Sequence, residues 1–368
     1  MRIFISLFLF MSFSLFHNLS AQRLLIGTYA GKNDSKGIYV YDFDASTGKA
    51  QLVSTTSASN PSYLAVATNN QFVYSVNENN QGMVSAFAYD QQTGKLTFIN
   101  QQPSLGSAPC YISIDRSGKW LFTGNYSSGN LTVHPIGTNG AVGPVQDSIQ
   151  HSGSSINKER QLSPHVHCTY ISGDNQFLYV SDLGLDQLMV YNFDAHQGRL
   201  ELNPQASVSL SPGGGPRHIV FTRNGRFGYL VEEMSGAVNL IERKENKHIV
   251  MQTLNLLKGN NDKAGGDIHL SPDEKFLYVS QRSNSTVQIF KVSPKTGRLR
   301  FVAEQSTKGN FPRNIVIHPS GDFLLAANQK SGDIVIFRRN AKTGLLKDTG
   351  ERIVLPSPVC LKWIAEPQ

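Results

Sequence analysis

Short apolar stretches separated by turn-forming residues run along almost the entire chain. Apolar and polar residues alternate at positions 84–87 and 286–290, which is the period of two expected for β-strands. No segment shows a competing helical periodicity, so the pattern predicts an all-β protein. Turns between such strands are marked by Thr-Gly pairs at 47–48, 93–94, 296–297 and 343–344.

One pattern recurs along the chain and predicts a repeat protein. A Pro or another small residue precedes an apolar strand, a turn of the Ser/Pro-Asp-Gly kind follows, and a second strand reads Phe-Leu-Tyr-Val or similar. A polar residue, a Gly/Asn turn and a third strand complete the unit. Repeats of 46 to 57 residues with several strands each are typical of β-propeller blades. The units begin at residues 61, 109, about 166, 216, 265, 312 and 358.

The two ends of the chain are predicted to complete one blade together. The seventh unit, from Pro358, has room for a single strand at 359–364. The segments 24–27 and 37–41 read as the second and third strands of a unit whose first strand is missing. Sharing a blade in this way closes the ring without an open seam. We therefore expect a seven-bladed β-propeller.

The first residues have the layout of a secretory signal peptide. Arg2 provides the positive start, an apolar run covers residues 3–16, and small residues stand at 20–21 before the expected cleavage site. The run is shorter than the roughly 20 apolar residues of a membrane span, and an uncleaved anchor is the alternative. We expect a signal peptide at residues 1–21, a single propeller domain at 22–368, and a periplasmic or secreted protein.

Cysteine content and charge argue against several other classes. Cys110, Cys168 and Cys360 are odd in number and widely spaced, unlike a disulfide framework, and no CxxC or His-x-x-x-His pattern suggests a zinc site. We interpret Cys110 and Cys168, which fall in expected strands, as small buried residues. The formal net charge of +7 fits either a basic soluble surface or attraction of anionic small molecules. Because Lys and Arg are scattered rather than clustered, no nucleic-acid partner is expected.

Ionisable residues concentrate in three consecutive units. The first strand of each propeller blade lines the central channel, so the residue after each unit start should lie near one channel mouth. That position holds Ser62, Cys110, His167, Arg217, Gly266, Arg313 and Val359. A second ring, one residue past the polar position, holds Glu78, Tyr126, Leu183, Glu233, Arg282 and Gln329. The units from 166, 216 and 265 thereby gather His165, His167, Arg217, His218, Glu233, Asp267, His269 and Arg282.

These residue types suit the opening of an ester or lactone. Such a reaction needs a base to activate water, for which His165, His167 and Glu233 are candidates. Arg217 and Arg282 are candidates for stabilising the oxyanion or for holding a carboxylate or phosphate. A lactone is already an activated ester, so we expect neither a metal nor a cofactor. Further substrate contacts are expected from His218, Asp267, His269, Glu78 and Asp182.

Each of these residues also has a structural interpretation. His165 and His167, at alternate positions of a strand, could be satisfied core histidines, and Arg217 could pair with an acid of a neighbouring blade. Glu233 could form a solvated pair with the preceding glutamate. Asp182 stands in a common turn sequence, from which it could also orient a histidine. The occurrence of three such groups in one sector favours the functional interpretation.

Several motifs resemble those of the lactonase-type β-propeller family. The family includes bacterial 6-phosphogluconolactonases and a fungal carboxymuconate-cyclising enzyme, and the resemblance implies a seven-bladed propeller. In the fungal enzyme a His, two Arg and a Glu form the proposed site, and the matching positions are His165 or His167, Arg217, Glu233 and Arg282. The motifs are Ile26-Gly27-Thr28-Tyr29, Val76-Asn77-Glu78, Pro164-His165-Val166-His167, Ser181-Asp182-Leu183-Gly184-Leu185-Asp186, Gly215-Pro216-Arg217-His218 and Asp267-Ile268-His269-Leu270-Ser271-Pro272-Asp273.

The residues and the resemblance leave three functions to distinguish. The first is a metal-independent lactonase acting on an anionic or sugar lactone such as 6-phosphogluconolactone. The second is an exported, non-catalytic binding propeller, since propellers host many unrelated functions. The third is a cyclising enzyme for carboxylated, muconate-like acids. The complete His/Arg/Glu/Arg set favours the lactonase, whereas the expected export signal departs from the cytoplasmic intermediates used by the enzymes that give the family its name.

Overall fold

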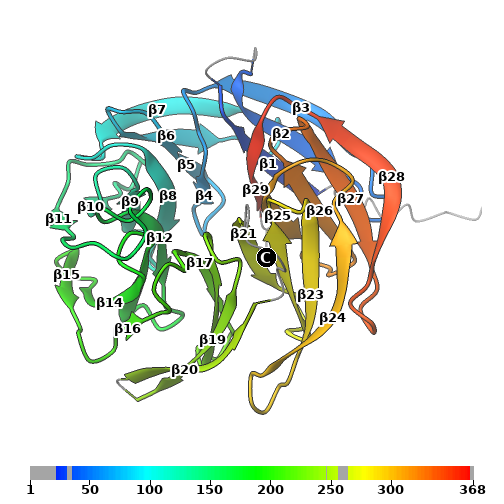
Figure 1. Ribbon diagram of the computed structural model, residues 1–368. Helices are drawn as coiled ribbons and strands as arrows, with labels where there is room; N and C mark the ends of the chain where they lie inside the picture. The colour runs from blue at the N-terminus through cyan, green and yellow to red at the C-terminus, as the bar shows by residue number, and fades with distance from the viewer. Residues whose placement is uncertain (1–21, 31–34, 246, 256–263, 365–368) are drawn as a thin grey trace, which may run out of the picture.

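Seven antiparallel sheets surround a central axis in the computed structural model, which describes residues 22–30, 35–245, 247–255 and 264–364 (Figure 1). No helix occurs within these ranges, and so none that could span a membrane. The expected signal peptide at residues 1–21 lies outside the described residues. The all-β, seven-bladed propeller predicted from the repeat is confirmed.

Each blade runs from an inner strand at the channel to an outer strand at the rim. Blade 1 consists of β29 (Pro358–Trp363), β1 (Gln22–Thr28), β2 (Gly37–Phe43) and β3 (Ala50–Ser57). Blade 2 consists of β4 (Leu64–Val66), β5 (Phe72–Asn77), β6 (Met83–Tyr89) and β7 (Leu96–Pro103). Blade 3 consists of β8 (Pro109–Ile114), β9 (Trp120–Asn125), β10 (Asn130–Pro135) and β11 (Asp147–Gln150).

The remaining blades follow the same order, and blade 4 adds a short fifth strand. Blade 4 consists of β12 (Val166–Ile171), β13 (Phe177–Asp182), β14 (Gln187–Asp194) and β15 (Arg199–Leu202), with β16 (Val208–Ser209) beside β14. Blade 5 consists of β17 (Pro216–Phe221), β18 (Phe227–Glu232), β19 (Val238–Lys244) and β20 (Lys247–Leu254). Blade 6 consists of β21 (Gly265–Leu270), β22 (Phe276–Gln281), β23 (Thr286–Val292) and β24 (Leu299–Ser306). Blade 7 consists of β25 (Pro312–Ile317), β26 (Phe323–Asn328), β27 (Asp333–Arg339) and β28 (Leu346–Val354).

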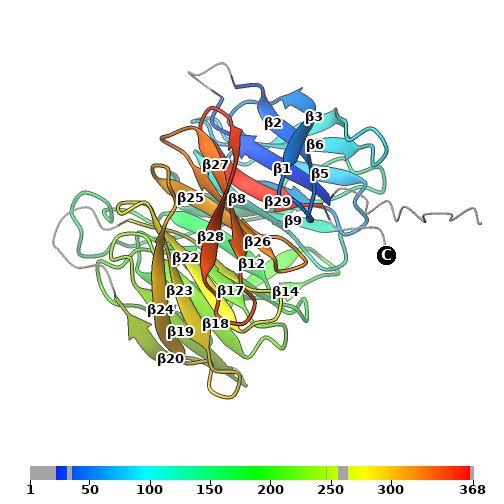
Figure 2. The ribbon, with the colours of Figure 1, turned by 90° about the vertical axis from the view of Figure 1, so that its right-hand side faces the viewer.

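The unit starts predicted from the sequence coincide with the inner strands. A proline opens β8, β17, β25 and β29, a position that suits proline because it cannot donate a ladder hydrogen bond. The unit from residue 61 begins its strand slightly later, at Leu64. The ring closes as expected, because β29 pairs antiparallel with β1 and so supplies the inner strand of blade 1 (Figure 2).

Neighbouring blades are held together by a contact that repeats around the ring. The aromatic residue that opens a second strand packs against a positive-φ glycine in the last turn of the next blade. A Cβ atom on these glycines would approach the ring to between 2.1 and 2.8 Å, so only glycine fits. Tyr74, Tyr229 and Tyr278, two positions further on, donate hydrogen bonds of 2.8–3.1 Å to the glycine carbonyls. The pairs are Phe72–Gly140, Trp120–Gly198, Phe227–Gly297, Phe276–Gly344 and Phe323–Gly48.

Candidate active site

The inner strands share an irregularity that aims one residue at the channel mouth. In β8, β12, β17 and β25 the pairing with the second strand shifts after the first residue, so the second residue has no partner in the ladder. Such a bulge re-aims the side chain of the extra residue. In β21 the shift covers two residues, Gly266 and Asp267. The residues at the other bulges are Cys110, His167, Arg217 and Arg313.

Buried amides fix a second ring of side chains. Asn77, Asn125 and Gln281 end the second strands of blades 2, 3 and 6, and each donates a hydrogen bond of 2.8–3.0 Å to a backbone carbonyl of another segment. These bonds determine where each strand leaves its sheet. The residues directly after these amides are Glu78, Tyr126 and Arg282. Glu233 stands at the equivalent position in blade 5.

The two rings enclose a cavity of about 220 Å³ at this mouth. Its lining residues are Tyr29, Glu78, Cys110, Tyr126, Arg160, His167, Glu233, Arg282 and Arg313. The structure thereby brings together four of the site residues predicted from the sequence, which are Glu78, His167, Glu233 and Arg282.

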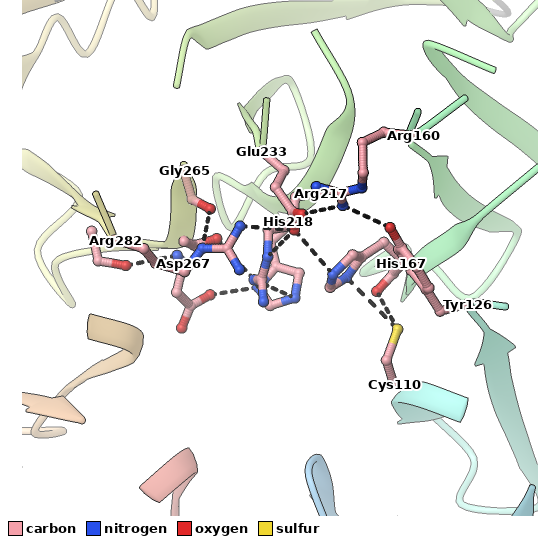
Figure 3. A network of polar contacts seen from close by, with 12 residues as sticks. Cys110, Tyr126, Arg160, His167, Arg217, His218, Glu233, Gly265, Asp267 and Arg282 are labelled. Carbon is pink, nitrogen blue, oxygen red and sulfur yellow. Dashed lines mark hydrogen bonds and ion pairs between the residues drawn. The ribbon is translucent and has the colours of Figure 1, made fainter. Parts of the chain in front are cut away.

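The carboxylate of Glu233 lies among the charged groups of the cavity (Figure 3). Its Oε1 accepts a hydrogen bond from Arg160 Nη2 at 2.7 Å, and its Oε2 accepts one from Arg217 Nε at 3.1 Å. The same Oε2 forms an ion pair with Arg282 Nη2 at 3.0 Å. Burial alone would raise the pKa of this carboxyl, but Arg282, His167 and Arg217 hold the pKa well below its usual range. Glu233 is therefore ionised at every physiological pH.

His167 lies between this carboxylate and a buried thiol. Its Nε2 is 3.5 Å from Glu233 Oε2, and its Nδ1 is 3.8 Å from Cys110 Sγ. The ring of Tyr126 meets the imidazole edge-on, with 5.5 Å between ring centroids. Burial and the positive charge of Arg217 lower the pKa of His167 well below 6.5. The imidazole is consequently neutral and can accept a proton.

Arg217 lies behind Glu233 and is not among the lining residues. Besides Glu233, its guanidinium donates to the carbonyl of Gly266 at 2.9 Å and to His218 Nε2 at 3.0 Å. His218 in turn donates from Nδ1 to Asp267 Oδ1 at 2.7 Å. These bonds fix the position from which Arg217 supports Glu233.

His218, Asp267 and His269, expected from the sequence to contact substrate, form a network beside the cavity and do not line it. Asp267 is buried and accepts hydrogen bonds from His269 Nε2 at 2.9 Å and from the side-chain amide of Asn314. Burial and the charge of Arg217 lower the pKa of His218 to about 3, so this imidazole is neutral. The network holds Arg217 in place.

His165 and Asp182 also lie outside the lining of the cavity. The ring of His165 stacks on Tyr126 with 4.5 Å between centroids, and its Nδ1 donates to the Tyr126 carbonyl at 2.9 Å. Asp182 is fully buried; one oxygen accepts the backbone N–H of His165 at 2.8 Å, and the other lies 2.6 Å from His151 Nδ1. Asp182 thus orients the chain at His165, and His167 is the histidine that faces the cavity.

Five of the lining residues were not assigned to the site from the sequence, and two of them, Cys110 and Tyr126, stood at the aligned ring positions without a role. Arg160 comes from the connection between β11 and β12, within the longest unit spacing of 57 residues, and that extra length was the available signal. Arg313 stands at the position after a unit start. Tyr29, whose hydroxyl lies 2.9 Å from each carboxylate oxygen of Glu78, arrives from the far end of the chain and had no comparable spacing signal.

The described residues contain neither a cluster of metal ligands nor a disulfide. Within the described ranges no three His, Cys, Asp or Glu side chains are placed to hold a metal ion. Cys110, Cys168 and Cys360 are buried and form no disulfide. Burial raises the pKa of the Cys110 thiol well above its usual value, so this group stays protonated beside His167.

Residues 23–363 match the family described as "Lactonase, 7-bladed beta-propeller". The chain belongs to this lactonase propeller family. A 6-phosphogluconolactonase of Formosa agariphila is 36% identical over 307 residues, covering 81% of this chain and 87% of the relative. The family resemblance drawn from the sequence motifs is therefore confirmed.

Two solved structures extend the comparison of this lactonase propeller. A Bacteroides fragilis protein described as a candidate 6-phosphogluconolactonase is 40% identical, with a TM-score of 0.89 and coverage of 95% of this chain and 99% of its own. The periplasmic gluconolactonase of Pseudomonas aeruginosa is 35% identical, also with a TM-score of 0.89, and covers 95% of this chain and 100% of its own. These relatives agree with the present propeller over nearly all of its length.

Proposed function

We propose that this lactonase propeller hydrolyses a sugar lactone in the cavity that His167, Glu233 and Arg282 line. The observation that carries the proposal is a neutral imidazole placed 3.5 Å from an ionised carboxylate that is itself held by guanidinium groups. Lactone opening needs a base for water and a cation for the developing oxyanion. The names of the relatives, 6-phosphogluconolactonase and gluconolactonase, support this reaction type.

His167 is the group we assign as the base. Protonation of Glu233 would leave Arg160, Arg217 and Arg282 without the carboxylate that each of them contacts, and such a loss of buried charge pairing is costly. Protonation of His167 creates instead an imidazolium beside an existing carboxylate. Glu233 therefore stabilises the protonated base rather than serving as the base itself.

The reaction then follows from the positions of these groups. Water attacks the lactone carbonyl carbon and passes a proton to His167. This attack forms the new C–O bond and a tetrahedral oxyanion. Arg282 stabilises this oxyanion; burial lowers its pKa to about 10, so it stays charged. The ring C–O bond breaks, and the departing oxygen takes the proton from His167. The product is the open hydroxy acid.

Hydrolysis is proposed to need no metal. Because the charge stabilisation comes from Arg282 and the proton transfer from His167, activity should survive a chelator. We expect dialysis against EDTA to leave kcat/KM within about twofold of the untreated value. Restoration of lost activity by an added divalent cation would contradict this assignment.

We also propose that the protein works outside the cytoplasm. The residues expected to form a signal peptide support this location, and the Pseudomonas aeruginosa relative is named as periplasmic. Fractionation of cells that produce the full chain should recover the cavity-bearing protein in the exported fraction, shortened at its N-terminus. Recovery of the uncut chain in the cytoplasm would refute the localisation but not the chemistry.

The proposal is tested by hydrolysis of 6-phosphogluconolactone and gluconolactone, read above their spontaneous opening. The purified protein is compared with His167→Asn and Glu233→Gln, and with Arg300→Met, an exposed residue of the outer strand β24, as the control. We expect both cavity variants to lose at least about 100-fold in rate, with the control unchanged. A folded protein that accelerates neither lactone would instead favour a binding propeller or a cyclising enzyme for carboxylated acids.

A further inference from the structure

The arginines of the cavity are not equivalent. Arg160, Arg217 and Arg282 each form an ion pair with the carboxylate of Glu233, at 2.7, 3.1 and 3.0 Å. In the described part of the chain, the guanidinium of Arg313 has neither a hydrogen-bond acceptor nor an ion-pair partner, although it lines the same cavity. Its donors are therefore available to a ligand.

The surroundings of Arg313 explain why no described side chain pairs with its guanidinium. It stands at the bulge of β25, where the second residue leaves the ladder and turns to the channel mouth. Its nearest described ring is that of Tyr29, 5.5 Å from the guanidinium carbon. The acid on this side, Glu78, accepts instead from the Tyr29 hydroxyl at 2.9 Å. The guanidinium thus faces the cavity beside the Tyr29 ring, and the carboxylate of Glu78 raises its pKa from a distance without forming an ion pair with it.

The charges around the cavity do not balance. Among the lining residues, three guanidinium groups, those of Arg160, Arg282 and Arg313, stand against two carboxylates, those of Glu78 and Glu233. His167 adds no charge, because burial keeps its pKa low. The excess is one positive charge in a partly buried space, where electrostatic interactions are strong. An anionic ligand would neutralise it.

We propose that Arg313 binds an oxyanion substituent that the lactone carries outside its ring, and that Arg313 thereby selects anionic over neutral lactones. A guanidinium binds phosphate or carboxylate through two parallel hydrogen bonds. Arg313 can bind such a group without breaking a contact to Glu233, whereas Arg160, Arg217 and Arg282 each hold that carboxylate. The inference rests on the proposed hydrolysis for its kinetic arm, and on ligand binding alone for its second arm.

The kinetic arm compares three lactones on wild type and Arg313→Met. They are 6-phosphogluconolactone, glucarolactone with its carboxylate, and neutral gluconolactone. We expect Arg313→Met to lower kcat/KM about 100-fold for whichever anionic lactone the wild type prefers, chiefly through KM, with less than threefold change for gluconolactone. Arg313→Lys should restore part of the loss, and Arg300→Met, which removes an exposed charge elsewhere, should change nothing.

Calorimetry supplies a measurement that needs no catalysis. Binding of 6-phosphogluconate and glucarate should be at least tenfold tighter than binding of gluconate, and Arg313→Met should abolish that difference. Equal binding by the wild type of gluconate and of the two acids that carry a second anionic group, or an unchanged preference in Arg313→Met, would overturn the proposal. If the wild type hydrolyses no lactone but its binding preference disappears in Arg313→Met, the anion-binding role of Arg313 would stand and the proposed lactonase activity would be refuted.

Discussion

His167 and Glu233 change each other's chemistry because both are buried beside arginines. Without its neighbours, buried Glu233 would have a raised pKa, yet the guanidinium groups hold the pKa well below its usual range. The same positive charges push the pKa of His167 downward, while Glu233 opposes that shift. An imidazole that is neutral but lies beside a carboxylate can take a proton during the reaction and return it.

The lowered pKa of His167 predicts the pH dependence of the reaction. Because the neutral imidazole is the active form, kcat/KM should fall as the pH decreases through this pKa, so the acid limb should lie below pH 6.5. Arg217→Met removes a charge that lowers the pKa of His167 and should move the limb to higher pH. The measurement is kcat/KM from pH 3.5 to 8. A limb at or above 6.5 in the wild type would refute His167 as the base.

Among the elements, the connection between β11 and β12 has the clearest influence on the site. It carries Arg160 to Glu233, and it is tied down at several points. His151 contacts Asp182 at 2.6 Å and the Tyr191 hydroxyl at 2.8 Å, while Gln161 donates to a backbone carbonyl of blade 4 at 2.8 Å. The connection is thus a fixed support for Arg160 rather than a free loop.

Substitution of Asp182 tests this anchoring. Asp182→Ala leaves the N–H of His165 and the imidazole of His151 without their buried acceptor, and should lower the free energy of unfolding by about 3 kcal/mol. Asp182→Asn keeps one carbonyl oxygen for His165 and should cost about half as much. Urea unfolding measures both. A similarly small loss, below about 1 kcal/mol, for both variants would show that the contacts do not anchor the connection.

The whole ring is required because the cavity is assembled from distant parts of the chain. Tyr29 comes from the end of β1, Glu78 from blade 2, His167 from blade 4 and Arg313 from blade 7. Two contacts join the last blade to the first: the pairing of β29 with β1, and the packing of Phe323 on the turn at Gly48. Loss of either would loosen the side of the cavity where blades 7 and 1 meet.

A pair of glycine substitutions measures the second of these contacts. Gly48 and Gly350 have similar φ angles of 81° and 85°, so alanine strains both backbones alike. A Cβ on Gly48 would lie 2.8 Å from the ring of Phe323, whereas one on Gly350 would meet nothing within 4 Å. We expect Gly48→Ala to cost about 2 kcal/mol more than Gly350→Ala. Equal losses in thermal or urea unfolding would show that the ring-closing contact adds nothing.

The fold could be predicted from the sequence, because the signals of a blade are local and repeated. Alternating strands, turn glycines and the Phe-x-Tyr pattern recur in each unit, so an error in one unit is corrected by the others. Pro109, Pro216 and Pro312 fall at the first residues of inner strands, as the repeat predicted. The units at the two ends of the chain are each incomplete, and this likewise predicted that the two ends share one blade.

Which of the candidate residues meet at the cavity depends on the folded arrangement of the blades. Equivalent positions in the repeat placed His167, Glu233 and Arg282 near one mouth, but spacing could not separate His167 from His165, whose ring stacks on Tyr126 instead. The partners of a side chain come from other blades and from the backbone bulges, and neither is encoded by the residue's own neighbours in sequence. For that reason no role for Arg160, which reaches Glu233 from a long connection, could be predicted from its position in the chain.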